Sequence, residues 1–363
     1  MAFLDVVNTI SRKQILPGLV DQVFKAGPTL AYIKRNCLQK WTGFQNQENF
    51  LYGMMNVEPY LPGDSFDISQ SQIFTGGTLT PRYYNVAVPA LLEKIKIEYA
   101  GPEAVFNYVD VLMQAAALTM SAKLATDIFE HGQTSSTVTT GGAAERTKVI
   151  NGLAEALNDG SETDFRGRTF PNYLTITRST VGTALNSPCT AAAGTIASTV
   201  GGSISYPILE QAFNSVVYGT ETPDLIITTN KGLSYIKMAF QAQQRFEGTS
   251  LDFGFQGVKF NSATIFQDRY APGSATVSTM ESTKLQQLQA LDGTNSTVNG
   301  ETLWFLNTKY IRFYVSTDSL YGFGFTGFLP AQDNSVVVGH YKYAGTCSVQ
   351  APRLMRVLDG ITG

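Results

Sequence analysis

The stretch VLMQAAALTMSAKLAT, residues 111–126, decides the fold of this chain, because so long an apolar run has to be buried in something. A membrane span needs ~20 consecutive apolar residues. Here Gln114, Thr119 and Ser121 interrupt the run, and Asp110 and Lys123 bracket it. The stretch therefore predicts a helix buried in protein rather than in lipid.

The residues around this stretch have helical spacing. One face is polar and carries Glu103, Asn107, Asp110, Gln114 and Ser121. The opposite face is apolar and carries Phe106, Val109, Met113, Ala116, Met120, Leu124 and Ile128. Pro102 suits the first helical position and Gly132 suits a stop after the last turn. The pattern predicts a helix over about 102–131, roughly 45 Å long at 1.5 Å per residue, with one wet edge.

The overall charge and composition indicate what kind of surface the protein has. The chain has 363 residues and a net charge of −3, which excludes a strongly basic nucleic-acid binder. Charged residues make up 15 %, against a usual ~25 %. So little charge indicates that much of the surface meets other subunits.

The three cysteines, Cys37, Cys189 and Cys347, are odd in number and far apart, which favours a reducing compartment over a disulfide framework. The start, MAFLDVVNTISRKQ, lacks a basic residue followed by an apolar core, so no signal peptide is predicted. The same start carries no long charged leader. We therefore expect a separate scaffolding protein rather than cleavage of a leader.

The first 93 residues differ in charge between their two parts. Residues 1–40 carry two acids, Asp5 and Asp21, and six bases: Arg12, Lys13, Lys25, Lys34, Arg35 and Lys40. Two short helices are predicted there, broken at residues 26–28. Residues 41–93 contain no lysine, and the acids among them up to position 92 are Glu48, Glu58, Asp64 and Asp67. This second part predicts a long extended hairpin around FTGGTLTP, residues 74–81.

The remaining elements alternate between helix and strand. KIKIEY, residues 94–99, predicts a half-buried strand ahead of the long helix, and residues 143–160 predict a short amphipathic helix stopped by Gly160. Residues 205–217 and 231–246 predict helices on either side of a strand at 224–230. The segments that follow are rich in strand-forming residues: 257–268, 301–316 and 335–358.

The sequence offers little that could carry chemistry. It has no phosphate-binding G-x-x-x-x-G-K-S/T motif, no C-x-x-C pair and only two histidines, His131 and His340. Cys347 lies seven residues after His340, and a nucleophile pair could be drawn between them. Both fall in an apparent strand hairpin, where a buried cysteine and a lone histidine are common. No catalytic, cofactor-binding or metal-binding residue is therefore expected, and the protein is not expected to be an enzyme.

The order of these elements is more specific than any motif, and it resembles the major capsid proteins of tailed bacteriophages with the Hong Kong 97-type shell fold. The stretches that carry the resemblance are VFKAGPTLAYIKRN (23–36), KIKIEYAGPEAVFNYVDVLMQAAALTMSAKLATDIFEHGQ (94–133), VINGLAEALNDGSETDFRGRTFPNYLTITRST (149–180), PDLIITTNKGLSYI (223–236) and CSVQAPRLMRVL (347–358). The resemblance covers nearly the whole chain. In such shells the long helix is the spine of the peripheral domain.

The resemblance implies an α+β fold in four parts. An N-terminal arm would occupy 1–45 and an extended β-hairpin loop 46–93. A peripheral domain with the spine helix would occupy 94–165 and 335–363, and an axial α/β domain 166–334. The implied function is structural: many copies, as pentamers and hexamers, close into an icosahedral head shell around double-stranded DNA.

The resemblance also implies partners and a location. The partners would be further copies of the chain, packaged DNA held by weak non-specific contact, and scaffolding, portal and decoration proteins, with no membrane. The shell would be assembled in the cytoplasm of a host bacterium and form part of the virion. Two alternatives stay open: an encapsulin-like nanocompartment of the same fold, and a cytosolic α/β hydrolase using Cys347 or a pair of carboxylates.

The charge difference between the arm and the rest of the chain predicts a contact between subunits. Six bases and two acids give residues 1–40 a charge of +4, so residues 41–363 carry −7. We expect Lys34 and Arg35 to meet a neighbour's loop, whose acids are Glu48, Glu58, Asp64 and Asp67. The alternative is a solvated basic arm that touches packaged DNA.

Some members of the resembled family lock their shells when a lysine of the extended loop attacks an asparagine of a neighbour. Here no lysine lies between Trp41 and Glu93, and Arg82 cannot substitute because its guanidinium stays protonated. Lys94 and Lys96 lie in a strand expected to pair within the subunit. We therefore expect a shell held by non-covalent contacts.

Overall fold

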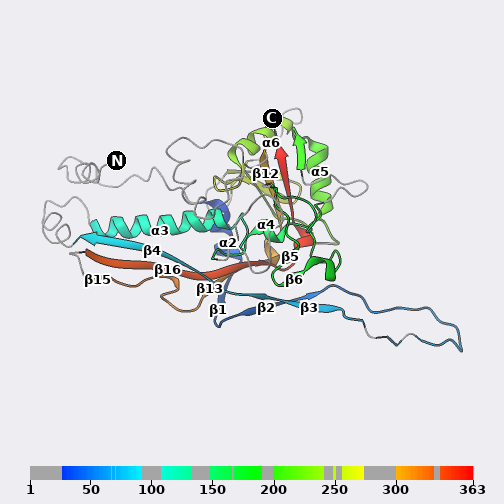
Figure 1. Ribbon diagram of the computed structural model, residues 1–363. Coiled ribbons are helices and arrows are strands. Elements are labelled where there is room, and N and C mark those ends of the chain that lie inside the picture. Colours follow the sequence, from blue (N-terminus) through cyan, green and yellow to red (C-terminus); the bar gives the residue numbers. More distant parts are fainter. Residues whose placement is uncertain are drawn as a thin grey trace.

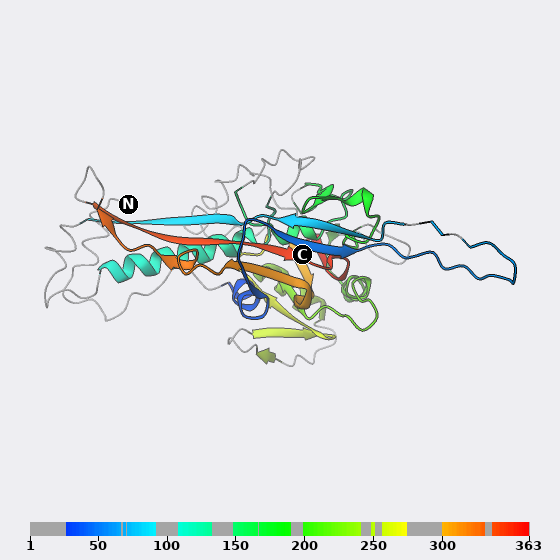
Figure 2. The same cartoon turned by 90° about the horizontal axis from the view of Figure 1, so that it is seen from below.

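The computed structural model describes residues 27–66, 68–69, 71–91, 108–132, 148–165, 167–189, 199–240, 248–250, 256–273, 300–330 and 336–362. Two sheets form the body of this part of the chain, and a long two-stranded hairpin projects from it (Figure 1). The first sheet and the hairpin extend in opposite directions (Figure 2). Helices α5 (Tyr206–Ser215) and α6 (Asn230–Phe240) lie beside the second sheet, at the end of the molecule where the C-terminus lies (Figure 1).

The first sheet is built on β16 (Val336–Val349), which at about 3.3 Å per residue is roughly 46 Å long. Its first ten residues pair antiparallel with β4 (Arg82–Leu91), from Val336 opposite Leu91 to Gly345 opposite Arg82. The other strands are β14 (Gly322–Phe325), β15 (Leu329–Pro330), β13 (Ile311–Ser316) and β1 (Leu38–Trp41). Strand β1 pairs parallel with β13. Segments from both ends of the chain therefore meet in one sheet.

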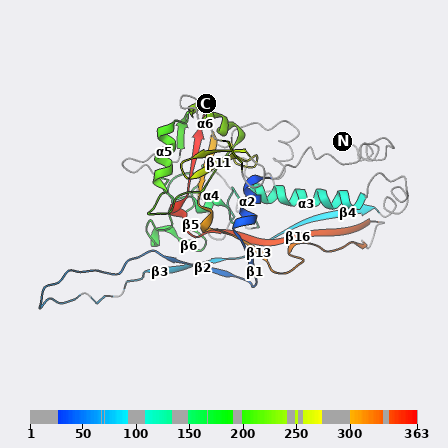
Figure 3. The same ribbon diagram turned by 180° about the vertical axis from the view of Figure 1, so that it is seen from behind.

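The long apolar stretch forms helix α3 (Tyr108–Asp127), which lies along β4 and β16 (Figures 1 and 3). Met120 and Leu124 are 1 % and 0 % exposed, and Met113 is half-buried. Gln114, on the opposite face, is exposed. These positions confirm a helix with a buried apolar face and a solvent-exposed polar face. The expected start at Pro102, with Phe106, lies outside the described residues.

The predicted end of this helix was wrong: α3 stops at Asp127 rather than near 131. Just after this end the chain is hydrogen-bonded to the start of α4 (Leu153–Ala156). The Leu153 amide donates to the Ile128 carbonyl at 2.7 Å. A Cβ on Gly132 would lie 2.1 Å from the Ile150 carbonyl oxygen, so this glycine permits a close backbone contact instead of capping the helix.

Tyr84 fixes the helix end over the sheet. Its hydroxyl donates to Asp127 Oδ2 at 2.9 Å and accepts the Ile150 amide at 3.0 Å. Lys123, one turn before, lies 3.0 Å from the other oxygen of Asp127. A buried carboxylate needs such partners, so one tyrosine of β4 joins the helix and the segment at 150.

The second sheet has seven strands among the described residues. In spatial order they are β7 (Thr199–Gly202), β17 (Arg356–Ile361), β12 (Glu301–Leu306), β8 (Leu225–Thr228), β11 (Ala263–Gln267), β10 (Gln256–Phe260) and β9 (Gly248–Ser250). Helices α5 (Tyr206–Ser215) and α6 (Asn230–Phe240) flank β8 in the chain. The helix–strand–helix order predicted after residue 204 is confirmed.

Alternate residues of the central strands face two separate cores, as the two-residue period of a strand requires. Ile226 and Leu303 pack in the core beneath α5 and α6. Ile227, Trp304 and Leu306 pack in the larger core that contains α3 and α4. Because every residue of β8 and β12 is buried, these strands read as continuous apolar runs rather than as alternating patterns.

Three further expectations have different outcomes. The predicted helix over 143–160 contains only the single turn α4 in its described part, 148–160. Of the two arm helices, the second is α2 (Pro28–Asn36), and the first lies outside the described residues. The strand predicted at 94–99 also lies outside them.

We expect Leu124→Ala to lower the free energy of unfolding by about 2–5 kcal/mol, because it leaves a cavity where the side chain is fully buried. Denaturant unfolding of the full chain measures the change. Leu118→Ala is the matched control on the same helix, since Leu118 is 37 % exposed. Equal losses in the two variants would contradict the burial of the Leu124 face.

Candidate inter-subunit surface

The projecting hairpin is formed by β2 (Asn46–Leu51) and β3 (Phe74–Leu79), paired from Asn46 opposite Leu79 to Leu51 opposite Phe74. The expectation of an extended hairpin is confirmed, but FTGGTLTP is not its turn. It supplies strand β3, and the turn lies within 52–73, which we call the hairpin tip. The tip extends far from both sheets (Figures 1 and 2).

Glu48 anchors the base of the hairpin to the first sheet. It is buried, and its carboxylate accepts hydrogen bonds from the Tyr314 hydroxyl, from Ser348 Oγ at 3.1 Å and from Gln350 Nε2 at 2.9 Å. Burial, followed by the neighbouring Glu48 carboxylate, raises the pKa of Tyr314. These three donors belong to Glu48's own subunit.

A second anchor comes from the small hairpin of β5 (Asn172–Tyr173) and β6 (Ile176–Thr177). The Thr78 amide donates to Thr175 Oγ1 at 3.0 Å, and the rings of Phe50 and Tyr173 meet with centroids 6.3 Å apart. A Cβ on Gly77 would lie only 3.0 Å from Leu174 Cδ1. The glycine in FTGGTL therefore lets the two hairpins approach closely.

Beyond these anchors the hairpin exposes an unusual amount of apolar surface. The large apolar side chains that are at least 60 % exposed there are Leu51, Met54, Met55, Val57, Tyr60, Leu61, Phe66, Ile68 and Phe74. A single exposed apolar residue is ordinary, but a contiguous group of this size marks an interaction surface. The strongest candidate for a functional site is therefore this apolar hairpin tip.

The expected acidic contacts are distributed unevenly along the hairpin. Glu48 is held inside its own subunit, whereas Glu58 and Asp64 are exposed on the tip. Local hydrogen bonds shape the tip around them, from Asn56 Nδ2 to Glu58 at 2.6 Å and from the Leu61 amide to Asp64 at 2.7 Å. Asp67 lies outside the described residues.

The expected basic contacts lie on α2, far from the tip of the same subunit (Figure 1). Lys34 is half-buried with its Nζ 4.1 Å from the centre of the Phe323 ring, and burial lowers its pKa. Arg35 is exposed. Any contact between Arg35 and the acids of a tip would therefore involve the tip of another subunit.

The Cys347 and His340 pair considered from the sequence does not form a site. Both residues lie in β16, seven positions apart, which places them roughly 23 Å apart along the strand. Cys347 is buried, and burial raises the pKa of its thiol. The His340 ring lies against Asn85, with Nδ1 3.1 Å from Oδ1. A thiol nucleophile with a histidine base is excluded at these positions.

The described part of the chain contains no group of three or more His, Cys, Asp or Glu side chains arranged to hold a metal ion. None of its helices is both long enough and apolar enough to cross a membrane.

Comparisons with known proteins give a fold but no sequence family. No family model matches the chain, and no curated protein matches it. Among solved structures, the capsid of cyanophage A-1(L) is similar with a TM-score of 0.63 at 13 % identity, over 96 % of each chain. An encapsulin complex from Synechococcus elongatus is similar with a TM-score of 0.58 at 8 % identity, over 98 % of this chain and 95 % of that one.

The capsid of a native GTA particle is similar over 99 % of this chain and 100 % of that one, with a TM-score of 0.55 at 7 % identity. Two of these structures are capsids and one is an encapsulin complex, and each is similar to this chain over nearly its whole length. This chain therefore has the Hong Kong 97-type capsid fold, as its order of elements indicated.

Sequence reasoning found the hairpin but missed its apolar tip. Residues 51–74 contain many apolar side chains without a helical or strand period, and such a segment can equally be a buried loop. The absence of any regular period, combined with the lack of lysine, was the only available indication. Exposure is a property of the folded chain, and only the structure shows it.

We expect Glu48→Ala to lower the free energy of unfolding by about 1.5–3 kcal/mol. The change leaves the hydrogen-bond donors of Tyr314, Ser348 and Gln350 without their acceptor. Denaturant unfolding measures this change. Glu58→Ala removes an exposed acid of the same hairpin and should change stability by less than about 0.5 kcal/mol. If both variants were equally stable, the anchor would have no energetic role.

Proposed function

We propose that this chain is the major capsid protein of a tailed bacteriophage, and that it self-assembles into the icosahedral head shell enclosing double-stranded DNA. The observation that carries the proposal is the apolar hairpin tip on a capsid fold. A two-stranded hairpin is marginally stable alone, and its exposed apolar side chains are explained if another subunit covers them. Repetition of one such contact by symmetry closes a shell.

The proposal includes the four parts expected from the sequence: an arm at 1–45, an extended loop at 46–93, a peripheral domain at 94–165 and 335–363, and an axial domain at 166–334. It has no catalytic step. The other partners would be packaged DNA, through weak non-specific contact, and scaffolding, portal and decoration proteins. The location would be the virion, after assembly in the cytoplasm of the host bacterium.

A nanocompartment shell is the second candidate, and the similarity to the encapsulin complex favours it specifically. The two candidates differ in content, because a phage head encloses DNA and a nanocompartment encloses protein. Particles purified from the natural source and treated with nuclease separate them. Protected double-stranded DNA supports the phage head, and a protein cargo without DNA supports the nanocompartment.

Replacing Met54, Val57 and Ile68 together by serine should abolish shell formation while leaving the thermal stability of the subunit unchanged, because all three are exposed and none belongs to a core. Negative-stain electron microscopy counts closed shells. Met238→Ser is the matched control, since Met238 is an exposed apolar residue of α6. Normal shells from the triple variant would refute the role of the tip.

We further propose that Arg35, with Lys34 beside it, contacts the acids of a neighbour's hairpin tip. Glu58 and Asp64 are exposed there, and exposed charges attract one another only within ~10 Å at 0.1 M salt. The change Arg35→Glu should reduce the yield of empty shells, and Glu58→Arg with Asp64→Arg in the same chain should restore it. Normal assembly of empty Arg35→Glu shells would favour contact with DNA instead.

A further inference from the structure

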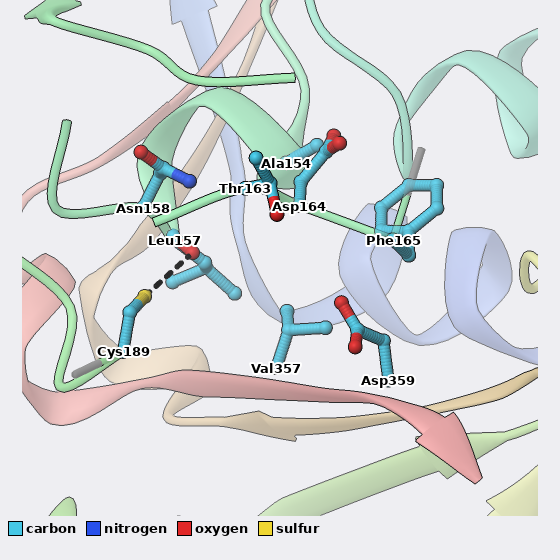
Figure 4. Close-up of a pocket in the computed structure, with 9 residues that line it drawn as sticks. All are labelled: Ala154, Leu157, Asn158, Thr163, Asp164, Phe165, Cys189, Val357 and Asp359. Atoms are coloured by element: carbon cyan, nitrogen blue, oxygen red, sulfur yellow. Dashed lines mark hydrogen bonds between the residues drawn. The ribbon is translucent and has the colours of Figure 1, made fainter. Parts of the chain in front are cut away.

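A small cavity lies between α4, the segment that follows it and strand β17. Its lining includes Leu157, Asn158, Asp164, Phe165 and Asp359, and its volume is about 10 Å³. That is room for about one water molecule. Figure 4 shows Val357 and Asp359 rising from β17 on one side, with residues 163–165 and α4 on the other.

Asp359 is the unusual member of this lining. It is 2 % exposed, and its Oδ1 atom has no hydrogen-bond partner. The side chain of Thr199, on the neighbouring strand β7, is its hydrogen-bond partner. A carboxylate buried with an unsatisfied oxygen and no cation is costly, because burial removes the water that stabilises its charge.

The charged groups around Asp359 increase this cost. Asp164 and Glu162 lie near enough to repel its negative charge. Arg168 binds two other carboxylates. Its Nε and Nη2 atoms donate to Asp164 at 2.8 and 2.6 Å, and Nη1 donates to Glu130 at 2.8 Å. Its single positive charge is thus shared by two carboxylates that do not include Asp359.

Buried cations near β17 have other partners. Arg178 donates to the carbonyls of Glu155 and Ala156 on α4 at 2.7 and 3.3 Å. Glu155 on α4 and Glu301 on β12 are further buried acids. Arg356, on the same strand, donates to Ser215 of α5 at 3.0 Å. The Cys189 thiol donates to the Leu157 carbonyl at 3.6 Å. Burial first, and then Asp164 and Glu162, raise the pKa of Asp359 to about 6.

We propose that Asp359 is a proton-binding site that makes the packing of residues 154–165 against β17 depend on pH. When Asp359 is protonated, the repulsion from Asp164 and Glu162 disappears and the new O–H group can donate into the cavity. When it is ionised, an unpaired charge lies in the cavity and favours local opening to water. The site needs no second subunit, so it is independent of the proposed function.

The direction of the effect follows from the two protonation states. The folded chain holds this proton more tightly than the unfolded chain does, because its Asp359 pKa is raised from 3.8 to about 6. The stabilisation is complete below about pH 4 and is lost as the pH rises through 6. Between these limits the folding equilibrium changes on the order of a hundredfold through this one group.

The experiment compares Asp359→Asn with the wild type in thermal scans of the full chain between pH 4.5 and 8. The variant has similar shape and no charge, so at pH 8 we expect it to melt roughly 3–5 °C higher, with a smaller difference at pH 4.5. Asp318→Asn is the matched control at an exposed aspartate, and it should follow the wild type at every pH. Parallel wild-type and Asp359→Asn curves would overturn the proposal.

Infrared difference spectroscopy of the wild type tests the site even if Asp359→Asn does not fold. Burial also raises the pKa of Asp268, so the spectra are compared with those of Asp268→Asn. We expect a buried carboxylic acid band that titrates near pH 6 in both proteins, and the lack of such a band in Asp268→Asn would overturn the proposal. A last experiment adds Ca²⁺ or Mg²⁺ to the thermal scans at pH 8. An unchanged melting temperature of the wild type supports a proton site. A higher melting temperature of the wild type but not of Asp359→Asn would show that the site binds a cation instead.

Discussion

The Tyr84 hydroxyl is the contact on which the arrangement of this protein depends. It holds Asp127 at the end of α3 and the amide of Ile150, so one side chain of β4 sets where the helix ends, where it lies on the sheet and where the chain resumes. Gly132 lies in the same region, where a Cβ would meet the Ile150 carbonyl oxygen at 2.1 Å. Helix, sheet and the segment leading to α4 therefore form one unit, from which the hairpin can project.

The hairpin is anchored to the body at its base and exposes an apolar surface at its tip. Glu48 and Gly77 hold the base to two different parts of the body, one by hydrogen bonds and one by close packing. Beyond Leu51 and Phe74, Tyr52 still packs against the core, but most of the large apolar side chains described there are exposed. This division suits a subunit that must fold alone and then be completed by a neighbour, as the proposed shell requires.

Buried charges hold the loops that follow α4. Arg168 joins Glu130 to Asp164, and Arg178 donates to the carbonyls of Phe170 and Glu155 at 3.1 and 2.7 Å. These loops have little regular structure, so their polar backbone groups need side-chain partners. Asp359 lies at the edge of the same region without a cation, which is why a proton is the simplest means of neutralising it.

The sequence by itself determined the order of elements and the presence of a long half-buried helix, because periodicity and turn residues act locally. It also determined the hairpin and the lack of lysine within it. Only the tertiary structure decided that α3 ends at Asp127, that Glu48 is internal and that the tip is apolar and exposed. Each of these depends on contacts between residues far apart in the chain, such as Glu48 with Ser348, and local patterns carry no information about them.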